Sequence, residues 1–132
     1  MNYLLDVNAL VAFGIINHSL NIRVTDWILA NAPLSVATCA ITELGFVRVI
    51  SQTASYGLTV AEAKLELSKL KGLPYLKWEF LSDNLDVSQL PGWVRNGRQT
   101  TDGHLIQLAQ AHGATLATLD SAIPGAFLIP NP

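Results

Sequence analysis

The sequence has little cysteine and little charge. Its single cysteine, Cys39, excludes an internal disulfide and fits a chain that works in a reducing cytoplasm. Only 14% of the 132 residues are charged, against about 25% in a typical soluble domain. Because half of the residues are hydrophobic, we expect self-association or a standing protein partner to cover part of the surface. A monomer with an unusually apolar surface is the alternative.

Long hydrophobic runs and nucleotide-binding glycine motifs are also absent. No apolar run approaches the roughly 20 residues of a membrane span. The stretch 1–16 is apolar, but it lacks a basic leading region and is interrupted by Asp6 and Asn8, so we expect no signal peptide. No Gly-x-Gly-x-x-Gly run or phosphate loop occurs. The length fits one domain, residues 1–132.

The net charge of −2 provides no general electrostatic attraction for nucleic acid. Any binding to phosphate must therefore be local, or it must be carried by metal ions.

Apolar periodicity predicts strands that alternate with helices. The Thr59–Glu62 segment has the form of a capping box, and Gly72 ends the helix that it opens. Thr38 is the expected cap of the helix that runs to about residue 52. Thr100 or Thr101 is the expected cap of the helix that reaches residue 113. The predicted strands are 3–6, 34–37, 75–81, 115–119 and 126–129, and the predicted helices are 9–16, 20–32, 38–52, 59–72 and 100–113. This order predicts an α/β fold: a three-layer α/β/α sandwich around a mostly parallel sheet of four to five strands.

Three of the ten acidic residues occupy positions where such a fold binds ligands, and a fourth, Asp102, could join them. Asp6 and Asp120 end strands, and Glu43 lies about one turn into the helix after the second strand. Ligands of open parallel sheets bind at the carboxyl ends of the strands. Asp102 opens the helix that leads into the fourth strand. We expect it at the opposite edge of the sheet unless the long loop before it carries the helix start over the site.

Four carboxylates in one cleft require a counter-charge. Two unit charges about 4 Å apart repel by about 4 kcal/mol at an effective dielectric near 20, and no lysine is near any of the four in sequence. An oxygen-only ligand set suits Mg²⁺ or Mn²⁺. Two such ions can clamp a phosphodiester, activate a water and stabilise the leaving oxygen. Taken singly, each acid is equally well explained as a helix or turn cap.

Other residue types suggest less. His18, His104 and His112 have no ligand spacing, and we expect no catalytic histidine. Trp78 and Phe80 are expected in the core.

The acidic residues lie in segments that resemble PIN-domain ribonucleases, and more closely the VapC-type toxins of bacterial toxin–antitoxin pairs. The segments are 4–10 (LLDVNAL), 41–48 (ITELGFVR), 101–105 (TDGHL) and 114–120 (ATLATLD). Each is weak alone, but the four occur in family order and spacing and span the domain.

The resemblance implies that Asp6, Glu43, Asp102 and Asp120 form a catalytic Mg²⁺ or Mn²⁺ site, with Asn8 and Thr118 as supporting polar positions. It further implies an RNA substrate, a homodimer, and an antitoxin that inserts a segment over the site.

Two further interpretations remain open. Asp6-Val7-Asn8 after the first strand resembles the start of a haloacid-dehalogenase-type phosphohydrolase that uses Asp6 as nucleophile, although that chemistry usually needs an acid where Asn8 stands. A non-catalytic interaction module of the same fold is the other.

As a hypothesis, Arg48, Arg95 and Arg98 contact RNA phosphates or an acidic group of the antitoxin.

Overall fold

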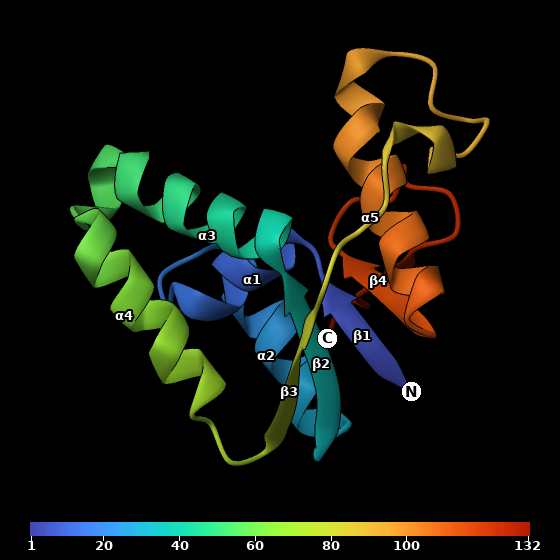
Figure 1. Ribbon diagram of the computed structural model, residues 1–132. Coiled ribbons are helices and arrows are strands. Elements are labelled where there is room, and N and C mark those ends of the chain that lie inside the picture. Colours follow the sequence, from blue (N-terminus) through green and yellow to red (C-terminus); the bar gives the residue numbers. More distant parts are fainter.

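The computed structural model describes all residues 1–132, and a five-stranded sheet lies at its centre (Figure 1). All strand pairs are parallel, and the strand order is β3-β2-β1-β4-β5. The strands are β1 (Asn2–Leu5), β2 (Leu34–Cys39), β3 (Leu76–Leu81), β4 (Ala114–Thr118) and β5 (Phe127–Leu128). The prediction of a parallel sheet with up to five strands is confirmed.

Helices cover both faces of this sheet. Successive side chains of a strand point to opposite faces of the sheet. Leu5 therefore packs in a core shared with α1 to α4, and Leu4 packs in a second core shared with α5. The helices are α1 (Val7–Gly14), α2 (Asn21–Ala30), α3 (Ala40–Gln52), α4 (Val60–Lys71) and α5 (Thr100–Ala111). The three-layer α/β/α architecture is therefore confirmed. No helix is long and apolar enough to cross a membrane.

Two of the three predicted helix caps are wrong. The capping box of Thr59 and Glu62 forms as predicted. Helix α3, however, begins after Cys39, whose backbone N–H donates to Thr42 Oγ1 at 2.9 Å. Thr38 stays in β2, where it pairs with β3. Gln99 occupies the cap position of α5 without a side-chain bond, because a short 3₁₀ helix (Gly97–Gln99) leads directly into α5.

The aromatic residues of β3 depart from the expected burial. Trp78 is half-buried and packs against the larger core. Phe80 is 54% exposed, because it lies on the edge strand β3 and lines an open groove between α3 and α4. The expectation that Phe80 belongs to the core is wrong.

Candidate functional site

Asp6 lies at the carboxyl edge of the sheet, between the end of β1 and the start of α1. It is only 6% exposed. Its Oδ1 accepts from the Val7 N–H at 2.8 Å, and its Oδ2 accepts from Thr118 Oγ1 at 2.7 Å. Burial raises the pKa of Asp6 above its ordinary value, the two hydrogen bonds lower it, and the charge of Asp120 raises it further. The net shift is upward, so the ionised form lacks full compensation.

The two predicted supporting residues meet beside Asp6. Asn8 Nδ2 donates to Thr118 Oγ1 at 3.1 Å, and Asn8 Oδ1 accepts from the Leu119 N–H at 3.1 Å. Thr118 Oγ1 also accepts from the Asp120 N–H at 3.1 Å. Thr118 is fully buried, and this network of direct hydrogen bonds joins the start of α1 to the end of β4.

Asp102 approaches the same edge from α5. Burial raises its pKa, and the charges of Asp6 and Asp120 raise it further. The expectation that the α5 start lies at the opposite edge is wrong. A helix between parallel strands runs back across the sheet, so it begins where the preceding strand ends and ends where the next strand begins. Three aspartates from three separate segments therefore lie within electrostatic reach of one another.

Glu43 is oriented differently from the three aspartates. Its Oε2 accepts from Thr38 Oγ1 at 2.5 Å and from Lys71 Nζ at 2.5 Å. Lys71 ends α4 and is 28 residues away in sequence, so the sequence contained no local signal for this contact. No lysine is near Glu43 in sequence, but the fold brings Lys71 to it. Asp6, Asp102 and Asp120, by contrast, form no ion pair.

The donor chemistry fits a hard divalent cation, although the side chains do not close around one. No group of three or more Asp, Glu, His or Cys side chains is gathered tightly enough to hold an ion as the side chains stand. The three aspartates nevertheless provide oxygen ligands without a cationic partner. Beyond the effect of burial, the charge of Asp120 raises the pKa of Asp6, and the charges of Asp6 and Asp120 raise that of Asp102. Such an uncompensated group favours Mg²⁺ or Mn²⁺ over softer metals.

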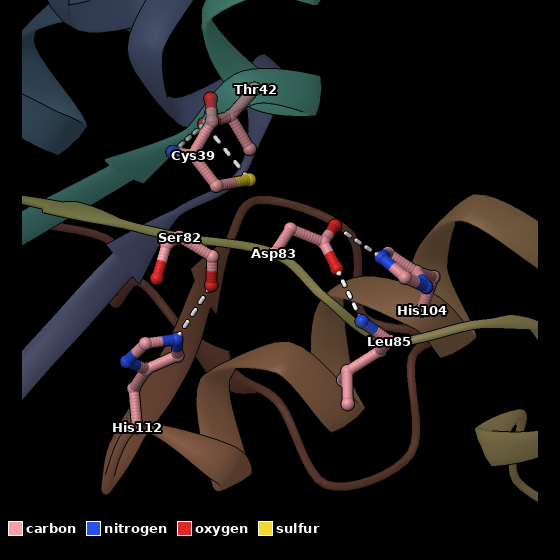
Figure 2. A network of polar contacts seen from close by, with 7 residues as sticks. All are labelled: Cys39, Thr42, Ser82, Asp83, Leu85, His104 and His112. Atoms are coloured by element: carbon pink, nitrogen blue, oxygen red, sulfur yellow. Dashed lines mark hydrogen bonds and ion pairs between the residues drawn. The ribbon is translucent and has the colours of Figure 1, made fainter.

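Two histidines, one in α5 and one directly after it, form hydrogen bonds with the segment that follows β3, as Figure 2 shows. His104 Nε2 lies 2.6 Å from Asp83 Oδ2, and His112 Nε2 lies 2.8 Å from the Ser82 carbonyl oxygen. Burial opposes ionisation of Asp83, but hydrogen bonds from His104 and the Leu85 N–H outweigh it and lower its pKa. These histidines hold the helix that carries Asp102, so their contacts are structural.

Gly103 allows a loop to pack directly beside Asp102. A Cβ atom at position 103 would stand 2.3 Å from Val94 Cγ2 and 3.2 Å from Pro91 Cδ. The same loop continues through Arg95 and Arg98, whose side chains are exposed. Arg48 is likewise exposed, on α3. All three arginines are without an ion pair, so their guanidinium groups are free to contact another molecule.

Comparison with known proteins places the chain in a family. The model of the PIN domain matches residues 3–125. "Ribonuclease VapC38" of Mycobacterium tuberculosis (strain ATCC 25618 / H37Rv) is 38% identical over 127 residues, covering 91% of this chain and 86% of that protein. "Ribonuclease VapC44" of M. tuberculosis (strain CDC 1551 / Oshkosh) is 35% identical over 134 residues, covering 96% of this chain and 94% of that protein.

Solved structures show the same fold at low sequence identity. The crystal structure of M. tuberculosis VapC20, described as a sarcin-ricin loop cleaving toxin, matches with a TM-score of 0.67 at 11% identity and covers 98% of this chain and 99% of that one. A chain of VapBC2 from Rickettsia felis, bound to a promoter DNA fragment, matches with a TM-score of 0.60 at 17% identity, covering 97% of each chain. The two relatives above are named VapC ribonucleases, and the chain belongs to the PIN-domain family.

Proposed function

We propose that the chain is a divalent-metal-dependent endoribonuclease and the toxin of a type II toxin–antitoxin pair. The observation that carries this proposal is the convergence of Asp6, Asp102 and Asp120, unpaired by any cation, at the carboxyl edge of a PIN-domain sheet. Relatives that the chain matches over more than nine-tenths of its length are named ribonucleases.

The protein's own groups would prepare this edge for a cation and a phosphodiester. Thr118 and the Val7 N–H orient the two oxygens of Asp6, while Asn8 fixes Thr118. Asp6, Asp102 and Asp120 would hold Mg²⁺ or Mn²⁺, with Glu43 as a fourth ligand once it is released from Lys71. The bound ion would polarise the phosphodiester and lower the pKa of a water molecule. Arg95 and Arg98 would contact phosphates that flank the cleaved bond.

A covalent phosphohydrolase mechanism is less well supported. Both oxygens of Asp6 already accept hydrogen bonds, and the side chain is nearly buried, so it is poorly exposed for attack on phosphorus. Asn8, where a general acid would be needed, is bound to Thr118 and the Leu119 N–H. A trapped aspartyl-phosphate on Asp6 would overturn this preference.

The antitoxin has a suitable docking surface next to the acidic edge. A groove of about 640 Å³ between α3 and α4 begins at Glu43 and is lined by apolar side chains, among them Leu44, Val47 and Val60. Lys64 and Lys71 also line it, so an apolar segment with acidic residues is the complementary occupant. We expect Leu44→Asp to weaken capture of the cognate antitoxin.

The homodimer stays a prediction, for which the measurement is the mass in solution.

The test is cleavage of total bacterial RNA by folded, antitoxin-free protein in Mg²⁺ or Mn²⁺ against EDTA. Asp6→Asn is the active-site variant, and Asp26→Asn, an exposed acid on α2, is the matched control. Discrete fragments that require metal, persist with Asp26→Asn and vanish with Asp6→Asn would support the proposal. Absence of cleavage at any metal concentration would favour a non-catalytic interaction module.

A further inference from the structure

The contact between Lys71 and Glu43 joins two helices at the border of the acidic site. Lys71 Nζ lies 2.5 Å from Glu43 Oε2, and the side chains are 35% and 24% exposed. The same oxygen accepts from Thr38 Oγ1 at 2.5 Å. Glu43 thus has two donors on one oxygen, and one of them carries a full positive charge.

Lys71 is held in this position from two further directions. Its ammonium lies 5.9 Å from the centre of the exposed Phe80 ring, an arrangement in which a cation is attracted by the ring face. Lys71 is also the last residue of α4, where the helix dipole favours positive charge. Thr38 and Phe80 are register partners in β2 and β3, so one corner of the sheet brings together all four residues.

A divalent cation and this ammonium cannot share Glu43 without repulsion. Like charges a few ångströms apart repel strongly in a partly buried site. The Glu43 carboxylate therefore has two competing positive partners: the lysine of its own chain and the ion held by the neighbouring aspartates.

We propose that Lys71 competes with the divalent cation for Glu43 and thereby sets the metal concentration at which the site fills. This inference rests on the proposed metal-dependent function. In the metal-free protein the ammonium neutralises one of four carboxylates and holds Glu43 away from the other three. When the ion binds, Lys71 must release Glu43, and its ammonium becomes free at the mouth of the α3/α4 groove.

The test is the dissociation constant for Mn²⁺, measured by electron paramagnetic resonance of free Mn²⁺ on metal-stripped protein. Lys71→Met removes the charge and keeps an apolar stem against Phe80. Lys69→Met is the matched control, because Lys69 lies on the same helix and pairs with Glu66 at 3.1 Å, away from the site. We expect Lys71→Met to bind Mn²⁺ about three- to tenfold more tightly than wild type, and Lys69→Met to be unchanged.

A double-substitution cycle ties the effect to Glu43. In a Glu43→Gln background, Lys71→Met should no longer tighten Mn²⁺ binding, because the shared carboxylate is gone. Unchanged or weaker binding by folded Lys71→Met, while wild type binds Mn²⁺, would overturn the competition and leave the proposed function intact. Absence of Mn²⁺ binding by wild type and Lys71→Met alike would overturn both. Circular dichroism in EDTA verifies that each variant is folded.

Discussion

The backbone of Gly45 in α3 lies so close to Val7 in α1 that a Cβ atom at position 45 would stand 2.5 Å from Val7 Cγ2. Val7 directly follows Asp6, and Gly45 follows Glu43 by two residues. Their contact therefore sets the separation between α1, which Asp6 caps, and α3, which carries Glu43.

Replacing Gly45 with alanine should push α3 away from α1. A valine side chain at 2.5 Å is not the flexible end of a long chain, so the helix must move, even though alanine has the higher helix propensity. We expect Mn²⁺ affinity to fall by about tenfold, measured by isothermal titration calorimetry. Val7→Ala in the same protein should restore affinity, because it removes both methyl groups. Gly97→Ala is the control, since open space surrounds Gly97; loss of affinity there, or no rescue by Val7→Ala, would contradict the explanation.

Thr118→Val should damage the site and the fold together. The substitution removes the hydroxyl that donates to Asp6 and accepts from Asn8, and we expect a loss of about 1–3 kcal/mol in the free energy of unfolding. Because the lost hydrogen bond lowers the pKa of Asp6, that pKa should rise, and Mn²⁺ binding should require higher pH. The control is Thr115→Val on the same strand, where the hydroxyl has only a 4.0 Å contact with the Met1 sulfur. It should change neither the free energy of unfolding nor the pH dependence of Mn²⁺ binding. Equal effects of both variants would count against the network.

Asp102→Asn should stabilise the metal-free protein. The pKa of Asp102 is raised from 3.8 by burial and by Asp6 and Asp120, so the folded state binds its proton more tightly than the unfolded state does. Its ionisation therefore costs stability, and the cost grows as pH rises from about 4 through the raised pKa. We expect the Tm in EDTA to exceed that of wild type by about 2–5 °C at pH 7, with the difference disappearing toward pH 4. A difference independent of pH would exclude this cause.

Charge reversal at Arg95 and Arg98 should weaken RNA binding. Both side chains are exposed and lack an ion pair. They lie on the loop that packs against Gly103, next to Asp102. We expect the KM for RNA to rise with little change in kcat or in Mn²⁺ affinity, measured by steady-state cleavage of a labelled RNA.

The arginine hypothesis extends to Arg48, where charge reversal should weaken cleavage or antitoxin binding. If neither process changes, Arg48 has no such role.

The architecture was predictable because local signals repeat along the chain. Short apolar segments marked the five strands, with clear alternation only in β3, and the capping box of Thr59 and Glu62 marked the start of α4. The strand ends at Asp6 and Asp120 then indicated the site. The α3 start was misplaced by one residue because Cys39 and Thr42 form a cap together, a pairing that residue preferences for single cap positions do not contain.

The contacts that shape the site were not predictable, because they join distant segments. Lys71 reaches Glu43 across 28 residues, and Val94 packs on Gly103 from a loop without regular periodicity. Exposure of Phe80 follows from its place on the edge strand beside the open α3/α4 groove, which is known only after the packing of the strands and helices is known. Hydrophobic pattern thus predicts elements, whereas tertiary packing decides which charges meet.

Simultaneous measurement of Mn²⁺ occupancy and RNA cleavage tests the central claim most directly. Metal-stripped wild type and Asp102→Asn would each be titrated with Mn²⁺, with bound ion followed by electron paramagnetic resonance and initial cleavage rate by a fluorescent RNA. We expect the wild-type rate to rise in proportion to occupancy and to be zero in EDTA, and Asp102→Asn to lose affinity and at least about 100-fold in rate. Cleavage that continues in metal-free wild type, or at an undiminished rate in Asp102→Asn, would contradict a metal-dependent nuclease centred on these aspartates.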